Sequence, residues 1–182
     1  MKRTLRVTGG EYRGRRISCP PGEIRPTMDR MRESLFSILG SLEGAAFLDL
    51  FAGSGIVALE AASRGANRIV AVERDRRKRE IVCRNLGIAE QGIDLEISGV
   101  ERYLASCTER FDFVYLDPPF SYRDKQSLLF LLSNSRAVAY ESVAILHHPG
   151  DDLAEFVGRM KRTDTRRYGG SNLDFYRVIS DL

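Results

Sequence analysis

The strongest constraint on the fold is a regular alternation of apolar runs and helix-like segments from residue 46 onward. The apolar runs fall at 46–50, 68–72, 95–97, 111–116 and 143–146, and segments of helical periodicity lie at 56–64, 75–86, 100–106 and 124–134. Strands that are apolar on both faces and alternate with helices are typical of a parallel sheet covered by helices. The pattern therefore predicts an α/β fold.

The last part of the chain departs from this alternation. We expect a short helix near 152–159 and then two strands, 161–168 and 172–179, joined by Gly169 and Gly170. A connection this short requires antiparallel pairing. The prediction is thus a Rossmann-like, mainly parallel seven-stranded sheet that ends in an antiparallel strand pair. The pattern alone does not separate this arrangement from other doubly wound folds.

The segment before the alternation has a different character. Residues 5–7 and 16–18 are short alternating runs around glycines, which predicts a small β-hairpin. A helix follows, capped by Thr27 or Asp29 and ended by Gly40 and Gly44. Its expected apolar face consists of Met28, Met31, Leu35, Ile38 and Leu39. We therefore expect an N-terminal extension over 1–44 and a Rossmann-like domain over 45–182.

Basic residues are concentrated near both ends of the chain. In residues 1–40 nine Lys and Arg side chains face four acids, and a second cluster comprises Arg159, Lys161, Arg162, Arg166 and Arg167. Only four of the 28 cationic residues are lysines, and the planar guanidinium suits phosphate oxygens and base stacking better than an ammonium does. The clusters predict a polyanion-binding face; a solvated basic surface is the alternative.

Several kinds of site are disfavoured by the sequence. No apolar run reaches the roughly 18 residues of a membrane span, and no apolar stretch follows the basic start of the chain, so we expect a cytoplasmic protein. Cys19, Cys83 and Cys107 are widely separated, and His147 and His148 are the only histidines. We therefore expect buried structural thiols, no disulfide framework and no metal.

The loop after the first apolar run is a candidate cofactor site. Asp49 is followed by Phe51-Ala52-Gly53-Ser54-Gly55, and glycine lets the backbone turn tightly and approach a ligand. The third glycine of a dinucleotide fingerprint is missing, because Leu59 lies near its place. Asp49 would also repel a diphosphate, whereas it can accept from an ammonium or a hydroxyl.

A second acid ends the next apolar run. Glu73 follows Gly55 by 18 residues, close to the roughly 20-residue spacing at which an acid accepts from ribose hydroxyls. Arg74 and Asp75 come next, and Asp75 can cap the following helix. Adenosine that carries a charged amino-acid tail fits these two acids better than NAD does.

The fourth apolar run leads into Asp117-Pro118-Pro119-Phe120. The two prolines remove two backbone donors and fix φ near −65°, so the segment is rigid and presents carbonyl oxygens. Together with the Asp117 carboxylate these oxygens form acceptors for an NH2 group, and Phe120 offers a flat face for a base. Acceptors aimed at an exocyclic amine would hold its nitrogen for attack on a methyl group. The target base must be unpaired or flipped.

With these motifs in place, the sequence resembles the RsmD family of 16S ribosomal RNA guanine-N2 methyltransferases. The most specific stretch is the segment 25–36, and the glycine loop, Glu60-Ala61, 63–66 and the tetrapeptide 117–120 match in order. The resemblance implies a class I fold, S-adenosylmethionine as the methyl donor, and a guanine of 16S rRNA or of a small-subunit assembly particle as the target.

The resemblance also implies roles for individual residues. Arg25, Pro26 and Thr27 would border the active site, and the expected RNA-binding residues are Arg13, Arg15, Arg25, Thr27, Arg30 and Arg32. The expected cofactor-binding residues are Asp49, Phe51, Ala52, Gly53, Gly55, Glu73, Arg74, Gly99 and Val100. Gly99 replaces a polar residue common in the family, so a contact to adenine there would use the backbone of Gly99 and Val100. His147 and His148 stand where an acid is common, and we interpret them as ordinary strand-end polarity.

Three other functions remain open. A DNA adenine-N6 methyltransferase would use similar chemistry, but the chain is short for a separate DNA-recognition domain. An NAD-dependent enzyme is disfavoured by the missing glycine and by Asp49. A non-catalytic RNA-binding assembly factor is disfavoured by the intact tetrapeptide at 117–120. We expect a monomer.

Overall fold

A computed structural model describes residues 4–21, 29–119, 121–122, 124–150 and 152–181. The chain divides into two units, Met1–Ser98 and Gly99–Leu182. The boundary proposed from sequence at 44/45 stays a prediction.

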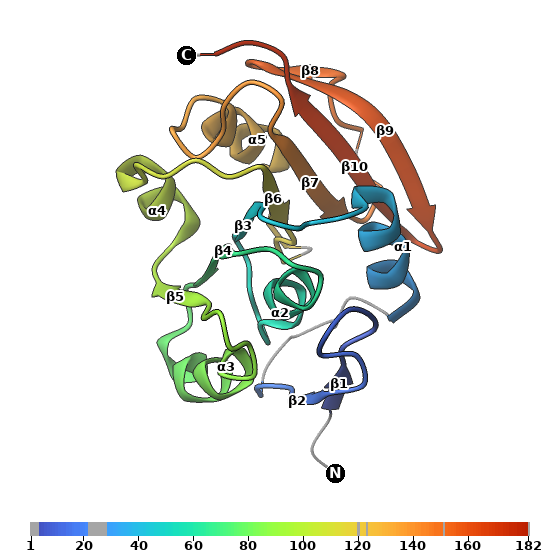
Figure 1. The fold of residues 1–182 in the computed structure, drawn as a ribbon. Coiled ribbons are helices and arrows are strands. Elements are labelled where there is room, and N and C mark those ends of the chain that lie inside the picture. The colour runs from blue at the N-terminus through green and yellow to red at the C-terminus, as the bar shows by residue number, and fades with distance from the viewer. Residues whose placement is uncertain (1–3, 22–28, 120, 123, 151, 182) are drawn as a thin grey trace. The chain divides into compact units, whose positions relative to one another are not determined.

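Three parallel strands of the first unit form where the apolar runs lie. They are β3 (Ala46–Asp49), β4 (Arg68–Glu73) and β5 (Asp94–Ile97), with β4 between the other two (Figure 1). The register pairs Asp49 with Ala71 on β4, so that β3 and β4 run side by side. Because the carboxyl ends of parallel strands meet at one edge, Asp49 and Glu73 end neighbouring strands at the same edge.

In the first unit, helices follow β3 and β4 as predicted. They are α2 (Ile56–Ser63), the 3-10 turn η1 (Arg76–Lys78) and α3 (Arg79–Leu86). Every residue of α2 is buried, which is expected of a helix that is apolar around most of its surface. Asp75 caps η1 by accepting from the backbone N–H of Arg77, as predicted.

The N-terminal hairpin is attached to α2. Strands β1 (Thr4–Arg6) and β2 (Arg16–Ser18) pair antiparallel, and α1 (Asp29–Leu39) follows. The Glu11 N–H donates to the carbonyl of Ser63 at 2.7 Å. Gly10 has φ +74°, and a Cβ there would lie 1.7 Å from that same carbonyl oxygen. The approach of the hairpin to α2 therefore requires glycine at position 10.

The face of α1 differs from the expected one. Met31 and Leu35 are buried as predicted, and Met28 lies outside the described residues. Ile38 is exposed, whereas Arg32 and Phe36 are buried. At 100° per residue, the buried side chains centre between positions 32 and 35 and leave position 38 at the edge.

The second unit contains two parallel strands and then an antiparallel set. Its strands are β6 (Phe113–Leu116), β7 (Val143–His148), β10 (Ser171–Val178), β9 (Met160–Tyr168) and β8 (Phe156–Val157), in this spatial order. β6 and β7 are parallel, and the other neighbours are antiparallel (Figure 1). The helices are α4 (Val100–Ser106) and α5 (Lys125–Ser133). The predicted ending in an antiparallel pair is confirmed.

The prediction of a short helix near 152–159 is wrong. Phe156 and Val157 form β8, which pairs with Lys161 and Met160 of β9 across a tight turn. Gly158 in this turn has φ +55°, a conformation that suits a hairpin and not a helix. The two-residue strand therefore adds an eighth strand to the seven that we expected.

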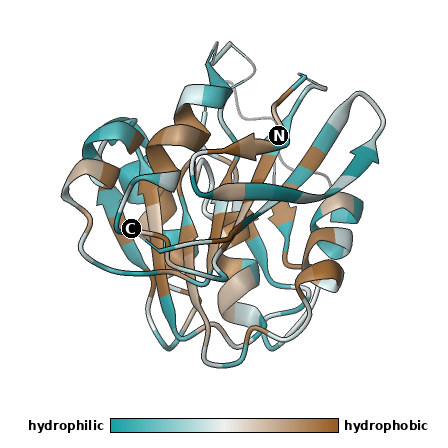
Figure 2. Ribbon diagram, turned by 90° about the horizontal axis from the view of Figure 1, so that it is seen from above, coloured by the Kyte–Doolittle hydropathy of each residue, from teal (hydrophilic) through white to brown (hydrophobic). Residues whose placement is uncertain are grey.

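Many of the buried apolar residues lie on β3, β4, β6 and β7 and on the helices α2 and α5, and ribbon segments of hydrophobic residues are brown in Figure 2. Within the described ranges, no helix combines the length and the apolar character that a membrane span requires. Nor do the described His, Cys, Asp and Glu side chains form a group of three or more that could hold a metal ion. Cys83 is exposed and Cys19 and Cys107 are partly exposed, so the expectation of buried thiols is wrong.

Candidate active site

The glycine loop of the first unit leaves β3 at Asp49, whose side chain is buried. Gly53 and Gly55 have φ +57° and +82°, a backbone conformation that L side chains rarely adopt. A Cβ on Gly55 would lie 2.7 Å from Leu86 Cδ2 of α3. The loop therefore needs glycine at 55 both for its turn and for the packing of α2 against α3.

Glu73 holds this loop in place. Its carboxylate is buried and accepts from the backbone N–H of Gly53 at 3.0 Å and of Asp75 at 2.8 Å. The Lys78 ammonium lies 3.3 Å from the same carboxylate. An ionised carboxylate can accept about four hydrogen bonds. Glu73 can thus hold the loop and still accept a hydrogen bond from a cofactor hydroxyl. The sequence did not predict that Glu73 holds the loop.

The other residues predicted to bind the cofactor differ in their burial and in their contacts. Ala52 is buried and its N–H donates to the Val72 carbonyl at 2.9 Å, which ties the loop to β4. Arg74 is exposed. Gly99 and Val100 belong to the second unit, where Gly99 precedes α4 and Val100 is buried in its first turn.

These features fit an adenosine ligand. The two positive-φ glycines let backbone N–H and carbonyl groups approach a ligand without an intervening Cβ. Two buried carboxylates, Asp49 and Glu73, end neighbouring strands beside that loop. A carboxylate pair of this kind can bind hydroxyl or ammonium groups and disfavours a diphosphate.

In the second unit, the proline turn follows β6. Pro118 is buried, Pro119 is exposed, and Phe120 lies outside the described residues. The Pro119 carbonyl accepts from the Tyr122 N–H at 2.7 Å. One of the carbonyls expected to face a substrate therefore also stabilises the turn itself.

Further contacts fix the end of this turn. The Tyr122 hydroxyl donates to the Glu101 carboxylate at 2.8 Å, and the Lys125 ammonium donates to the Tyr122 carbonyl at 2.9 Å. Partial burial and the hydrogen bond to Glu101 raise the pKa of Tyr122 to about 12. The turn after Asp117 is thus anchored to α4 and to the first residue of α5.

The Asp117 side chain contacts His147, which we interpreted from the sequence as an ordinary polar residue at a strand end. The Asp117 Oδ1 atom lies 2.8 Å from Nδ1 of His147, near the end of β7. The parallel register pairs Leu116 with Leu146, so the next residues of the two strands are neighbours. Both residues follow apolar runs of the sequence, but the pairing of the two strands becomes known only from the structure.

Comparisons with known proteins identify the family of the chain. The profile of a family described as "Conserved hypothetical protein 95" matches residues 5–177. The chain belongs to this family, the RsmD family.

Individual relatives extend over most of the chain. The Ribosomal RNA small subunit methyltransferase D of Escherichia coli (strain K12) is 36% identical over 143 residues, which cover 76% of this chain and 72% of that protein. YlbH of Bacillus subtilis (strain 168) is 31% identical and covers 95% of this chain and 98% of its own. The solved structure of yhhF from Escherichia coli has a TM-score of 0.86 at 28% identity and covers 98% of this chain and 99% of its own. The predicted class I methyltransferase fold is confirmed.

The residues expected to bind RNA in this RsmD-family member, five arginines and Thr27, fall into three groups. Arg13, Arg15 and Arg30 are exposed. Arg25 and Thr27 lie outside the described residues. Arg32 is fully buried, so its expected contact with RNA is wrong.

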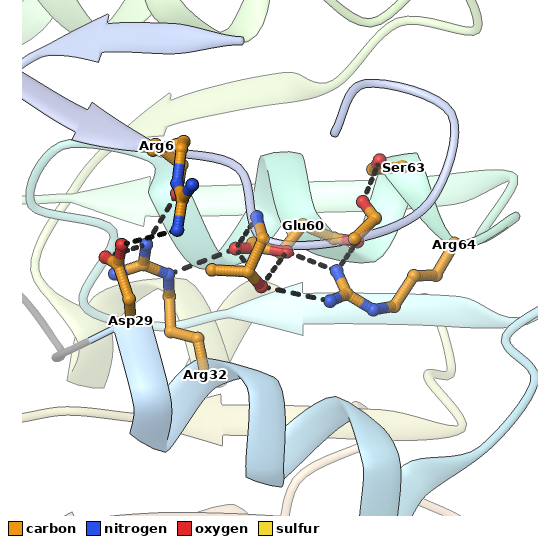
Figure 3. Close-up of polar contacts among 8 residues, drawn as sticks. Arg6, Asp29, Arg32, Glu60, Ser63 and Arg64 are labelled. Carbon is orange, nitrogen blue, oxygen red and sulfur yellow. Dashed lines mark hydrogen bonds and ion pairs between the residues drawn. The ribbon is translucent and has the colours of Figure 1, made fainter. Parts of the chain in front are cut away.

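Arg32 instead belongs to a buried ionic cluster that also contains Glu60, Arg64, Thr8 and Asp29 (Figure 3). The Glu60 carboxylate accepts from the Thr8 N–H at 2.8 Å and from Arg32 Nε at 3.1 Å, and it pairs with Arg64. Arg32 also donates to the Arg6 carbonyl at 2.6 Å. Glu60 thus joins the hairpin, α1 and α2, so Arg32 contributes to folding.

Proposed function

We propose that the chain methylates the exocyclic N2 amine of a guanine in 16S rRNA, within the small ribosomal subunit or an assembly particle of it. S-adenosylmethionine is the methyl donor. Membership of the RsmD family and the name of the Escherichia coli relative support the reaction and its RNA class. The observation that carries the chemical part is the anchored turn that presents the Asp117 carboxylate after β6.

In the first unit, the residues proposed to bind the cofactor are Asp49, Phe51, Ala52, Gly53, Gly55, Glu73 and Arg74. In the second unit, cofactor binding is proposed for Gly99 and Val100. Glu73 and Asp49 supply acceptors for hydroxyl and ammonium groups, and the glycines supply close backbone approach. When bound, S-adenosylmethionine supplies an electrophilic methyl group on a sulfonium sulfur.

The proposed catalytic residues are Asp117, Pro118, Pro119 and Phe120. The Asp117 carboxylate accepts an N–H of the amine, which orients the nitrogen lone pair and raises its electron density. The proline pair keeps the turn rigid, and Phe120 offers a face for the base. Asp117 also lies beside the proton that the nitrogen loses once it carries the methyl group, so it need not act as a strong base.

RNA contacts are proposed for the exposed arginines of the N-terminal segment, Arg13, Arg15 and Arg30, and for Arg25 and Thr27. On β9, Arg166 and Arg167 are exposed as well. Guanidinium groups at such positions bind phosphates without reading sequence. We expect a monomer that works in the cytoplasm.

A substrate competition tests the proposal. Small subunits and 16S rRNA from a strain that lacks the methylation, and unmethylated duplex DNA, are offered together with radiolabelled S-adenosylmethionine. We expect label in the rRNA of the subunits and none in DNA. Label in DNA adenine would favour the DNA methyltransferase, and no label in any substrate would favour the assembly factor.

A further inference from the structure

His147 and His148 are adjacent on β7, yet they contact different parts of the second unit. His147 Nδ1 lies 2.8 Å from Asp117 Oδ1, and His148 Nε2 lies 3.2 Å from Asp174 Oδ2 on β10. Side chains alternate between the two faces of a strand. Each histidine therefore has its own aspartate, and the two pairs can be compared directly.

The two pairs differ in burial. The side chains of His148 and Asp174 are each 1% exposed, whereas those of His147 and Asp117 are 10% and 21% exposed. Asp174 also accepts from Thr165 at 2.6 Å and from Arg162 at 3.1 Å. The pair His148 and Asp174 is part of a buried network between strands, whereas the pair His147 and Asp117 is exposed enough to reach a substrate.

The contact fixes the orientation of the Asp117 carboxylate. A carboxylate in its ionised form only accepts hydrogen bonds, and the histidine tautomer with its N–H on Nδ1 donates to it. A bond to Oδ1 holds the plane of the carboxyl group and hence the direction of Oδ2. Without that bond, the carboxylate could rotate about its Cβ–Cγ bond, whose preference is broad.

We propose that His147 is a positioning residue that aims Asp117 at the amine of the substrate, an inference that rests on the proposed function. The group that orients Asp117 is the His147 N–H at Nδ1, the ring nitrogen bonded directly to Cγ. The register of β6 and β7 pairs Leu116 with Leu146, so Asp117 and His147 directly follow a paired position.

Three substitutions of His147 test the role. Asparagine has its amide nitrogen on Cγ, like Nδ1, whereas glutamine places the nitrogen one bond farther out. Leucine fills similar space and cannot donate. We expect His147→Leu and His147→Gln to lower kcat by roughly tenfold to a hundredfold, since small misplacement at a reacting centre costs about that much. His147→Asn should recover most of kcat, and KM for S-adenosylmethionine should stay constant in all three.

His148→Asn is the matched control. Because it alters the buried pair with Asp174, it should lower the melting temperature but leave kcat of the folded protein unchanged. A melting temperature that falls alike in His147→Asn and His147→Gln, with equal kcat in the two, would overturn the positioning role. Should His147→Leu fail to fold, the contrast between asparagine and glutamine still decides.

Failure of the inference can be distinguished from failure of the proposed function. Wild-type kcat in His147→Leu, together with an inactive Asp117→Ala variant, would overturn the role of His147 and leave the reaction as proposed. Full turnover by Asp117→Ala would overturn both.

Discussion

Gly55 and Gly14 provide a controlled test of the glycine loop at the scale of single residues. Their φ angles are +82° and +85°, but a Cβ on Gly55 meets Leu86 at 2.7 Å, whereas one on Gly14 meets nothing within 4 Å. Gly14→Ala should therefore cost about 1–2 kcal/mol of unfolding free energy from backbone strain alone. Gly55→Ala should cost about 2–4 kcal/mol, because overpacking against a buried leucine is added.

Denaturant unfolding measures both losses, and equilibrium dialysis measures cofactor affinity. We expect affinity to fall only in Gly55→Ala. Equal losses of stability in the two variants would contradict the close packing at Gly55.

Asp174 gives a pH dependence with a defined sign. Burial alone would raise its pKa, but hydrogen bonds from His148, Thr165 and Arg162 outweigh it, and the pKa is lowered. A lowered pKa in the folded state stabilises the protein above the unfolded value of about 3.9, and this stabilisation is lost as the pH falls below it. The unfolding free energy should therefore decrease below about pH 4, with a shallower decrease in Asp174→Asn. Identical slopes in the two proteins would exclude this contribution.

At the scale of elements, Glu60 of α2 contacts Thr8 in the N-terminal hairpin, Arg32 of α1 and Arg64 at the end of α2. Its removal leaves Nε of the buried Arg32 and the Arg64 guanidinium without this carboxylate. Glu60→Ala should therefore cost about 3–5 kcal/mol of unfolding free energy. The control is Glu80→Ala, because Glu80 and Arg84 form an exposed i,i+4 pair that is worth only about 0.3–0.5 kcal/mol. Similar losses in urea titrations of the two variants would show that the cluster adds no stability.

Two arginines of helix α1 have different expected roles. Arg30 is exposed and Arg32 is buried against Glu60. Arg30→Ala should raise KM for rRNA several-fold, weaken its salt dependence and leave the melting temperature unchanged. Arg32→Ala should lower the melting temperature. The assignment fails if Arg30→Ala destabilises the protein or leaves KM for rRNA unaltered.

For the whole molecule, the sequence predicted most of the architecture because the relevant forces are local and repetitive. Runs that are apolar on both faces identify buried parallel strands, and β3, β4, β6 and β7 lie where those runs are. The residues 152–159 were assigned to a helix because a two-residue strand has too few residues to show periodicity. The turn at Gly158 became visible only with its pairing partners.

The site was only partly predictable for a related reason. Motif residues such as Asp49, Gly53 and Glu73 are recognisable because one strand end and one turn determine their positions. Contacts such as Glu60 with Arg32, or Asp117 with His147, join separate elements and depend on register and helix rotation. From the sequence alone, Arg32 is expected at the surface, because charged side chains are rarely fully buried. Burial is possible when a carboxylate pairs with the guanidinium.

The most direct test is the identity of the methylated nucleoside. Small subunits that lack the modification are treated with wild-type protein or with Asp117→Ala, and the rRNA is digested and analysed by mass spectrometry. We predict N2-methylguanosine with the wild type and at least a hundredfold less with Asp117→Ala, while the variant still binds S-adenosylmethionine. A methyl group on another atom, or equal yields from the two proteins, would contradict the account.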